Sequence, residues 1–339
     1  MNITFFFRNY NPKVPSIENS FAPFISNISK QHHVEVYYVP YAGSNPIKLL
    51  KNIWFIHKKS CKDGINHVTG DIHYGIIGLI GRASVLTIHD DAAIRAAHRG
   101  VYDKIYKWIF WIFLPILLSD DVWCISPATL NNIKKYYNSK KLHVVTHHSF
   151  SPSFHYVNHE FNYTCPKILH IGTTERKNLE STMMAIEGIS CKLVVLKEMT
   201  QKQHKLAQKM HIDYENYYGI PENEVVKIYE SSDIVVLPSS FEGFGMPIVE
   251  AQIVGVPVIT TNIEPMNWVA GEGAVLIENP NDIEEYKKAI GRLIEDEDLR
   301  KKVIGKGREN SLRFSIESAT EHCCAIYKKI LIRKEGGYD

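Results

Sequence analysis

Short hydrophobic runs alternate with longer segments of mixed polarity, and this alternation constrains the fold more than any other feature. The runs are rich in β-branched and aromatic residues, and several lead into helical patterns, as near Leu179 and Pro247. They lie at residues 3–7, 34–39, 85–89, 167–171, 193–196, 234–237 and 256–260. Strands that alternate with helices form parallel sheets, because parallel strands need long crossover connections. We therefore predict an α/β protein with doubly wound parallel sheets.

The chain is long enough for two domains, and its charge is divided between its halves. Its 339 residues suffice for two hydrophobic cores. Residues 1–150 hold 17 Lys and Arg against 9 Asp and Glu, whereas the remainder hold 22 against 28. Residues 150–166 are rich in Ser, Pro and aromatic side chains and lack periodicity. We predict domains over residues 1–155 and 156–314; the alternative is one domain in which 150–166 is a long surface loop.

The basic first half indicates an anionic partner. The sequence has no RNP, zinc-finger or helix-turn-helix pattern, which argues against nucleic acid. A phosphorylated substrate or an anionic membrane surface fits the charge better. The six cysteines lack CxxC spacing, and the apolar run before Arg8 is typical of a first strand rather than a secretory signal. We therefore expect reduced thiols and a cytoplasmic location.

Residues 102–118 (YDKIYKWIFWIFLPILL) form the most apolar segment. Its uncharged part, residues 108–118, is too short for a membrane span, which needs about 20 residues. Two interpretations stay open. The segment is either a buried core helix, or an interfacial helix whose Trp and Phe side chains enter the lipid headgroups. Four cations would flank the interfacial helix: Arg95, Arg99, Lys104 and Lys107.

The segment 232–261 (SDIVVLPSSFEGFGMPIVEAQIVGVPVITT) carries the clearest chemical pattern. A strand over 234–237 leads into a loop, Pro247 opens a helix, and Gly255 ends it. The loop places backbone N–H groups at a helix N-terminus, which suits a diphosphate. The loop and helix start comprise Gly243, Phe244, Gly245, Met246 and Pro247.

Glu242 in this loop and Glu250, expected in the first turn of the helix, can face one cleft. Carboxylates accept hydrogen bonds from vicinal hydroxyl groups, so a polyhydroxylated phosphate ester would satisfy both features. The alternative is purely structural: Glu250 would complement the helix dipole, and the glycines would only make a tight turn.

Two cations follow the strand over 167–171. Arg176 and Lys177 come shortly after Gly172 and Thr173, at the strand end where such sheets bind ligands. They could hold a diphosphate whose charge grows as it departs. The alternative is a solvated surface pair.

The first half has its own polar strand ends. His89 and Asp90 follow the apolar strand over 85–89, and Asp71 and His73 follow Gly70. These are candidate ligand contacts, although a histidine at a strand end is often structural. No His or Cys cluster has metal-ligand spacing, so we expect no metal cofactor.

At this point the sequence resembles the retaining GT-B glycosyltransferases of glycosyltransferase family 4, especially members from bacterial surface-polysaccharide clusters. The strongest element is the E-x7-E pattern from Glu242 to Glu250. Further similar blocks are residues 16–19 (SIEN), 67–74 (HVTGDIHY), 84–90 (SVLTIHD), 125–133 (ISPATLNNI), 176–178 (RKN) and 313–331 (RFSIESATEHCCAIYKKIL). The resemblance implies two Rossmann-like domains that face each other across a cleft, with a C-terminal helix, 315–333, that returns to the first domain.

The resemblance also implies roles for single residues. Glu242 would bind the donor sugar, Glu250 the ribose, Lys177 the phosphate, and His89 the transferred sugar. The backbone of Gly243 to Met246 would cradle the diphosphate. Family members often carry Arg after the glycine matched by Gly172; here Thr173 occupies that place, and Arg176 could supply the charge. The first-domain glycine-rich loop of many members is replaced by residues 8–20.

Together these features predict an enzyme that moves a hexose from a UDP- or GDP-sugar to a glycan or lipid-linked acceptor, with retention of configuration and without a metal. The expected process is O-antigen or capsule biosynthesis. The basic half and the apolar helix suggest that the enzyme works at the inner face of the cytoplasmic membrane. Asp71, His73 and Asp90 would contact the acceptor. The alternatives are a sugar-nucleotide epimerase, a phosphorylase, or a non-catalytic partner subunit of the same fold.

Overall fold

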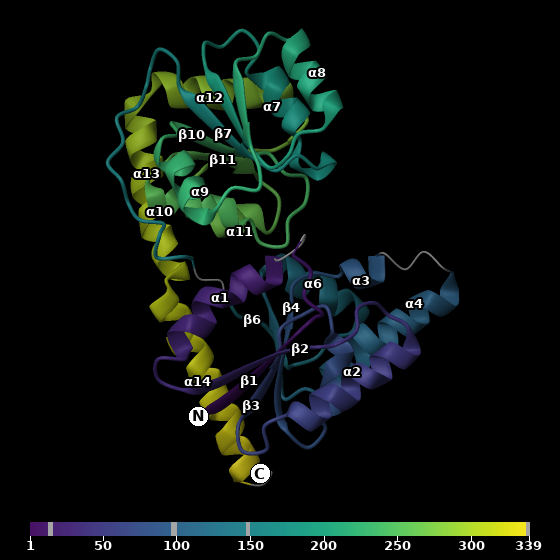
Figure 1. Cartoon of the computed structure of the whole chain (residues 1–339). Helices are drawn as coiled ribbons and strands as arrows, with labels where there is room; N and C mark the ends of the chain where they lie inside the picture. The colour runs from purple at the N-terminus through teal and green to yellow at the C-terminus, as the bar shows by residue number, and fades with distance from the viewer. Residues whose placement is uncertain (13–15, 96–99, 147–149, 337–339) are drawn as a thin grey trace. The chain divides into compact units, whose positions relative to one another are not determined.

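The computed structural model describes residues 1–12, 16–95, 100–146 and 150–336. The described chain divides into two compact units (Figure 1). Unit 1 comprises Met1–Phe150 and Phe314–Asp339, and unit 2 comprises Ser151–Arg313. Each unit contains one six-stranded sheet in which all strand pairs are parallel. The prediction of doubly wound parallel sheets is therefore confirmed.

Unit 1 has the strand order β2-β1-β3-β4-β5-β6. Its middle strands are buried along their whole length, as expected for a parallel sheet covered on both faces. Its elements are β1 (Asn2–Phe7), α1 (Ser16–Ile28), β2 (His33–Tyr38), α2 (Pro46–Lys59), β3 (Ile65–Val68), η1 (His73–Leu79), β4 (Ala83–Ile88), α3 (Ala92–Arg95), α4 (Val101–Trp108), the π-helical turn η2 (Ile109–Phe113), α5 (Leu114–Leu118), β5 (Asp121–Cys124), α6 (Pro127–Tyr136), β6 (Leu142–Val144) and α14 (Ile316–Glu335).

Unit 2 has the strand order β12-β11-β10-β7-β8-β9. Its elements are β7 (Lys167–Ile171), η3 (Glu175–Lys177), α7 (Leu179–Ala185), β8 (Lys192–Leu196), α8 (Gln201–Lys209), β9 (Tyr214–Tyr217), α9 (Glu222–Glu230), β10 (Ile234–Leu237), α10 (Met246–Val254), β11 (Val258–Thr261), α11 (Met266–Ala270), β12 (Val275–Ile277), α12 (Ile283–Glu295), α13 (Glu297–Ser311) and η4 (Leu312–Phe314), whose last residue belongs to unit 1.

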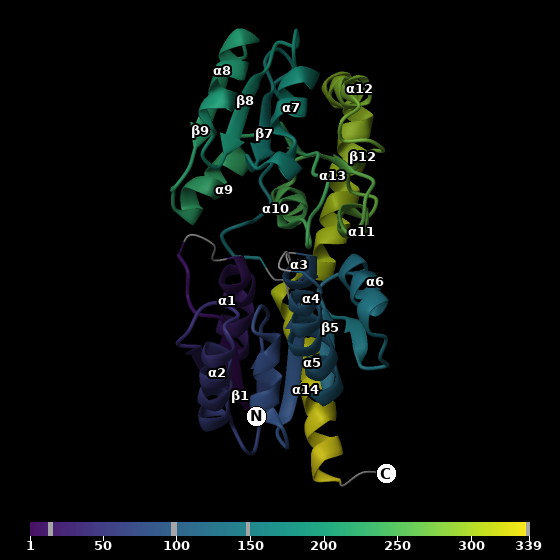
Figure 2. The same cartoon turned by 90° about the vertical axis from the view of Figure 1, so that its right-hand side faces the viewer.

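The C-terminal helix α14 packs on the sheet of unit 1, as predicted (Figure 2). The Tyr327 ring stacks on Trp123 at 5.2 Å, and its hydroxyl lies 2.6 Å from Nδ1 of His67 on β3. Asn27 on α1 donates a 3.0 Å hydrogen bond to Thr320. These contacts join α1 and α14 into the layer that covers one face of the sheet, where a core rich in phenylalanine lies.

The opposite face of this sheet is covered by α2, η1 and the α4–η2–α5 segment. In the latter segment, Trp111, Ile112 and Ile116 are buried in the core. The Nε1 group of Trp108 donates a 3.1 Å hydrogen bond to the Tyr136 carbonyl. Within the predicted segment 102–118, the structure thus favours the core interpretation for Trp111, Ile112 and Ile116, whereas Tyr102, Ile105 and Leu117 are exposed. The flanking Arg99 lies outside the described residues. No helix in the described ranges has both the length and the apolar composition of a membrane span.

Candidate functional site

The topology of unit 2 singles out the carboxyl ends of two neighbouring strands. From β7 the chain adds β8 and β9 on one side and then returns to add β10 and β11 on the other. The crevice beyond the carboxyl ends at such a reversal is where open α/β sheets bind ligands. The segments that leave this point are 172–178 after β7 and 238–245 after β10. They contain the residues that the sequence pattern selected.

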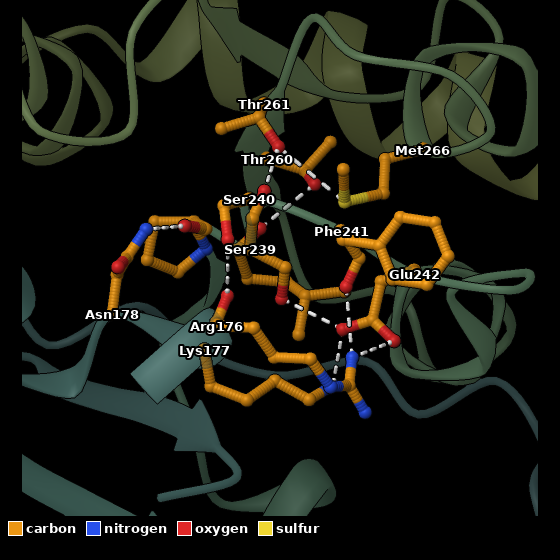
Figure 3. A network of polar contacts seen from close by, with 12 residues as sticks. Arg176, Lys177, Asn178, Ser239, Ser240, Phe241, Glu242, Thr260, Thr261 and Met266 are labelled. Carbon is orange, nitrogen blue, oxygen red and sulfur yellow. Dashed lines mark hydrogen bonds and ion pairs between the residues drawn. The ribbon is translucent and has the colours of Figure 1, made fainter. Parts of the chain in front are cut away.

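Backbone and side-chain hydrogen bonds hold these two segments together (Figure 3). The Ser240 N–H donates to the Arg176 carbonyl at 2.9 Å. The Asn178 side chain donates to the Pro238 carbonyl at 2.8 Å. Asn178 adopts a left-handed conformation with φ of 54°, which asparagine tolerates better than most residues. The turn that carries Arg176 and Lys177 is therefore fixed against the loop that carries Glu242.

Glu242 is the centre of an ionic network and is only 8% exposed. Its Oε1 atom accepts a 2.7 Å hydrogen bond from Ser239 Oγ and forms an ion pair with Lys177. Its Oε2 atom accepts a 2.7 Å hydrogen bond from Arg176 Nη1, which also donates to the Phe241 carbonyl at 2.8 Å. Burial alone would raise the pKa of Glu242, but the charges of Lys177 and Arg176 hold it below its ordinary value.

Lys177 is the buried cation of this network, with a side chain that is 11% exposed against 46% for Arg176. Burial lowers the pKa of Lys177, whereas the charges of Glu242 and Glu250 act in the opposite direction. The lysine stem lies against Gly172, where an added Cβ would come within 2.7 Å of Lys177 Cγ. Gly172 also has a φ of +100°, so this position requires glycine on two grounds.

Thr173 occupies the position where the family resemblance leads us to expect Arg, and its side chain packs within unit 2. Its hydroxyl donates a 2.7 Å hydrogen bond to the Glu198 carbonyl. Its own carbonyl accepts a 2.8 Å bond from the Gln203 side chain. The threonine thus ties the end of β7 to the start of α8. The exposed guanidinium at this site comes from Arg176 instead.

The N-terminus of α10 has the predicted form. Gly245, with φ of 104°, is the N-cap residue, and Met246 and Pro247 begin the helix. A Cβ at Gly245 would lie 3.1 Å from Ile248 Cδ1. The Phe244 ring is buried and contacts Trp268 with a ring-centroid distance of 6.4 Å. The Phe244 side chain therefore anchors the loop and is not available to a ligand.

Glu250 lies in the second turn of α10 and not in the first, which corrects the expectation from the sequence. Because Met246 is the first helical residue, position 250 is one full turn further along the helix. Its Oε2 atom accepts a 2.6 Å hydrogen bond from the Tyr229 hydroxyl on α9. Burial raises the pKa of Glu250 even though this hydrogen bond opposes the shift.

Unit 1 has a second polar cluster at its own topological reversal, between β1 and β3. Arg8 follows β1 and contacts Glu18 on α1 through Nε at 3.1 Å and Nη2 at 3.0 Å. Its Nη1 atom donates a 2.5 Å hydrogen bond to Asp71 beyond β3. His89, after β4, has Nε2 at 2.8 Å from the Thr69 carbonyl, and burial lowers the pKa of this histidine.

The other two candidates in unit 1 have structural partners. His73 is buried, and its Nδ1 atom lies 2.7 Å from the Trp111 carbonyl, which favours the structural alternative for it. Burial lowers the pKa of His73. Asp90 Oδ1 accepts a 2.8 Å hydrogen bond from the Ala92 N–H at the start of α3.

Sequence reasoning missed four residues of these clusters. They are Arg8 and Glu18 in unit 1 and Tyr229 and Ser239 in unit 2. Arg8 could have been found, because it is a cation that follows a strand, as Lys177 does a few residues after β7. The partners Glu18 and Tyr229 lie on helices, and no spacing in the sequence connects them to the sites.

A hollow in the surface of unit 2 does not coincide with the candidate site. This hollow of about 610 Å³ is lined by His159, Lys167 and Asp233, among others, at the amino ends of β7 and β10. The charged network lies at the opposite, carboxyl ends. Within the described ranges, no group of three or more His, Cys, Asp or Glu side chains is arranged to hold a metal ion. The candidate site is therefore defined by its chemistry and by the sheet topology.

Comparison with known proteins agrees with this fold. Residues 158–310, just under half of the chain, match the family model described as glycosyl transferases group 1. The O-antigen chain mannosyltransferase B of Escherichia coli is 33% identical over 113 residues, which are 33% of this chain and 29% of that protein. The capsular polysaccharide biosynthesis glycosyltransferase CapM of Staphylococcus aureus is 29% identical over 163 residues, which are 44% of this chain and 41% of that protein.

Among solved structures, HepE of Anabaena in complex with UDP and glucose superimposes with a TM-score of 0.76 and 14% identity. The match covers 97% of this chain and 100% of that one. By contrast, the chain spans less than a third of the length of several curated relatives that it matches. Residues 158–310 therefore form a domain of the glycosyl transferases group 1 type, within a chain that has the GT-B fold.

Proposed function

We propose that this protein is a retaining hexosyltransferase of glycosyltransferase family 4. It transfers a hexose from a UDP- or GDP-sugar to a hydroxyl of a glycan or lipid-linked oligosaccharide during O-antigen or capsule synthesis. Unit 2 is the nucleotide-sugar domain and unit 1 the acceptor domain. The observation that carries the proposal is the cluster of Arg176, Lys177 and Glu242 beyond the carboxyl ends of β7 and β10.

The diphosphate of the donor would bind between Lys177 and the backbone of residues 243–246. An ammonium group has three donors, so Lys177 can keep its bond to Glu242 while it contacts a phosphate oxygen. The exposed Arg176 supplies the second cation. Gly172 and Thr173 border the diphosphate on the β7 side, and Pro247 fixes the first turn of α10 behind it.

The two glutamates would bind the two sugar parts of the donor. Glu250 accepts hydrogen bonds from the ribose, and Glu242 accepts them from the hydroxyl groups of the transferred sugar. A carboxylate oxygen can accept two hydrogen bonds, and the bonds described for Oε2 of Glu242 include only the one from Arg176. The lowered pKa of Glu242 keeps this carboxylate ionised near neutral pH.

In unit 1, His89 would contact the transferred sugar, and Asp71 and Asp90 would contact the acceptor. His73, whose side chain is buried, would be a further acceptor contact. The low pKa of His89 makes it a neutral hydrogen-bonding group near neutral pH rather than a cation. Arg8 holds Asp71 in place through a 2.5 Å hydrogen bond.

The reaction would proceed on one face of the sugar. The bond from the anomeric carbon to the diphosphate oxygen breaks, the acceptor oxygen attacks that carbon, and the departing phosphate accepts the acceptor proton. Lys177 and Arg176 stabilise the charge that grows on the leaving phosphate. These two cations perform the task that a bound metal performs in other transferases, so we propose a metal-independent reaction.

The comparisons support both the proposed role in O-antigen or capsule synthesis and the proposed sugar transfer. One relative is named for O-antigen mannosyl transfer and another for capsule biosynthesis. A structural neighbour binds UDP and glucose. With the basic first half, these names favour a lipid-linked acceptor and peripheral association with the inner face of the cytoplasmic membrane.

Product analysis tests the proposal against its alternatives. Purified protein is incubated with UDP-, GDP-, ADP- and dTDP-hexoses and a lipid-linked oligosaccharide mixture, and products are identified by mass spectrometry and ¹H NMR. We expect one donor to give an acceptor-dependent product with an axial anomeric bond like that of the donor. An epimerase would change the donor without acceptor, and a phosphorylase would need inorganic phosphate. Absence of any product with every donor would favour a non-catalytic subunit.

A further inference from the structure

The outer side of helix α2 carries a row of apolar side chains, although this side points away from the core. The helix buries Leu49, Asn52 and Ile56 against the sheet. Counted at 100° per residue, Ile47, Leu50 and Trp54 lie on the opposite side. These three side chains are 64–66% exposed. Such a row is unusual, because the solvent side of an amphipathic helix is normally polar.

Every charged side chain of α2 is a cation. The helix contains Lys48, Lys51, Lys58 and Lys59 and neither Asp nor Glu. Lys51 and Lys58 lie on the same side of the helix as the apolar row. The Lys58 ammonium stands 5.3 Å from the centre of the Trp54 ring. The outer side of α2 thus combines exposed apolar side chains with basic ones.

Helix α4 has exposed apolar side chains of its own. It belongs to the same layer as α2, because both pack on the same core of unit 1, and Figure 2 shows both on the side that faces the viewer. The Tyr106 hydroxyl of α4 donates a 3.0 Å hydrogen bond to the Ser44 carbonyl just before α2. Val101, Tyr102 and Ile105 are exposed on α4. Both helices therefore carry exposed apolar side chains, but Ile105 lines a separate hollow with Ile94 and Tyr136.

We propose that the outer side of α2 is a docking surface for an anionic lipid bilayer. Leu50 and Ile47 enter the boundary between headgroups and acyl chains, Trp54 lies at headgroup depth, and the lysines contact lipid phosphates. This surface replaces the segment 102–118 as the proposed membrane contact. The proposal deepens the membrane association under the proposed function, but vesicle binding is measurable without any transfer activity.

A second copy of the chain fits this surface poorly. A two-fold interface centred on α2 would bring the same four lysines of each copy together with no acidic side chain of α2 to neutralise them. An anionic bilayer has the opposite charge and accepts apolar side chains at the same time. The chemistry of α2 therefore favours lipid over self-association.

Vesicle flotation tests the proposal with the full chain. One vesicle set contains phosphatidylcholine alone, and the other adds about 30 mol% phosphatidylglycerol as the anionic lipid. We expect binding to the anionic set only. Leu50→Ser/Trp54→Ser should weaken binding at least tenfold, and Lys51→Gln/Lys58→Gln about 25-fold, since each lysine near an anionic surface contributes about fivefold. The matched controls Ile332→Ser, at an exposed isoleucine of α14, and Lys202→Glu, on α8, should bind like wild type.

A second measurement locates the contact directly. Trp54 is the one exposed tryptophan of the five in the sequence, all of which are described. Brominated lipids should quench its fluorescence in anionic vesicles, and Trp54→Phe should bind normally but lose this quenching. The proposal is overturned if wild type does not bind anionic vesicles, if it binds both sets equally, or if the α2 variants bind like wild type. It is also overturned if wild type is a dimer that Leu50→Ser/Trp54→Ser converts to a monomer.

Discussion

Replacing Glu242 by Gln should destabilise unit 2 mainly through Lys177. The change keeps the shape of the side chain but removes the charge that faces a buried ammonium group. Removing one partner of a buried ion pair typically costs about 3–5 kcal/mol. Because Gln can still accept a hydrogen bond from Lys177, we expect the lower end, about 3 kcal/mol. In a unit of this size that corresponds to a fall of about 6–12 °C in its unfolding temperature.

The two cations should behave differently because their burial differs. Lys177→Met leaves Glu242 with Ser239 and Arg176, so the loss should be about 1–2 kcal/mol. Arg176→Met removes a half-exposed pair and should cost less than about 1 kcal/mol. The double variant Glu242→Gln/Lys177→Met should lose less than the sum of the two single changes, with a coupling of about 2 kcal/mol.

Urea unfolding followed by hydrogen exchange of peptides from β7 and β10 gives these free energies for unit 2 alone. A second double-mutant cycle, with Arg176→Met, Glu242→Gln and the double variant, gives the coupling of Arg176 to Glu242 for comparison. The reasoning is refuted if the Glu242 and Lys177 effects are additive, or if Arg176 couples to Glu242 as strongly as Lys177 does. Either result would mean that Lys177 is not the buried counter-ion of Glu242.

Three further predictions concern single positions. Glu250→Gln should increase the free energy of unfolding of unit 2 at pH 7, because burial raises the pKa of this carboxyl group. The increase should shrink as the pH falls and vanish below the pKa of glutamate in the unfolded chain, about 4.3. Equal increases at pH 7 and pH 4 in urea titrations would contradict this. Gly70→Ala should cost about 1–3 kcal/mol, because φ is +131° and the new Cβ would lie 2.6 Å from His89 Cδ2; an unchanged His89 NMR signal would speak against it. Trp111→Ala should cost about 3–5 kcal/mol in thermal unfolding, because this side chain is 5% exposed and donates a 2.7 Å bond to the Asp71 carbonyl, whereas a near-neutral change would show that it is not core.

The strands that the sequence predicted are rich in β-branched and aromatic side chains. β7 and β10 match the expected residues 167–171 and 234–237 to the residue, and β4 is displaced by one or two positions. β3 (INHV) and β5 (DVWC) were not predicted, because buried polar side chains interrupt their apolar runs. Asn66 is satisfied by the backbone of Cys61, and His67 by Tyr327 and Thr87. The partners of His67 lie 20 and 260 residues away in the chain, so local periodicity cannot reveal them.

In the candidate site, too, local sequence patterns predicted some features, and contacts between distant segments determined the others. The pattern from Glu242 to Glu250 and the cations at 176–177 were visible because they lie in short segments at strand ends. That Glu242 accepts bonds from both cations and Ser239 follows from the pairing of β7 with β10, which no local pattern contains. The position of Glu250 was predicted one turn too early, because the sequence does not show that Met246 already begins α10.

The central claim is that the carboxyl ends of β7 and β10 bind a nucleoside-diphosphate sugar through Lys177. Isothermal titration with UDP-, GDP-, ADP- and dTDP-hexoses tests it most directly, with Lys177→Met as the variant and Lys209→Met, at the end of α8, as the matched control. We predict that one donor binds to wild type and to the control, and that Lys177→Met weakens this binding by at least tenfold, since a charge-assisted hydrogen bond contributes about 1.5–3 kcal/mol. Binding of no donor to wild type, or equal binding to Lys177→Met, would contradict the claim.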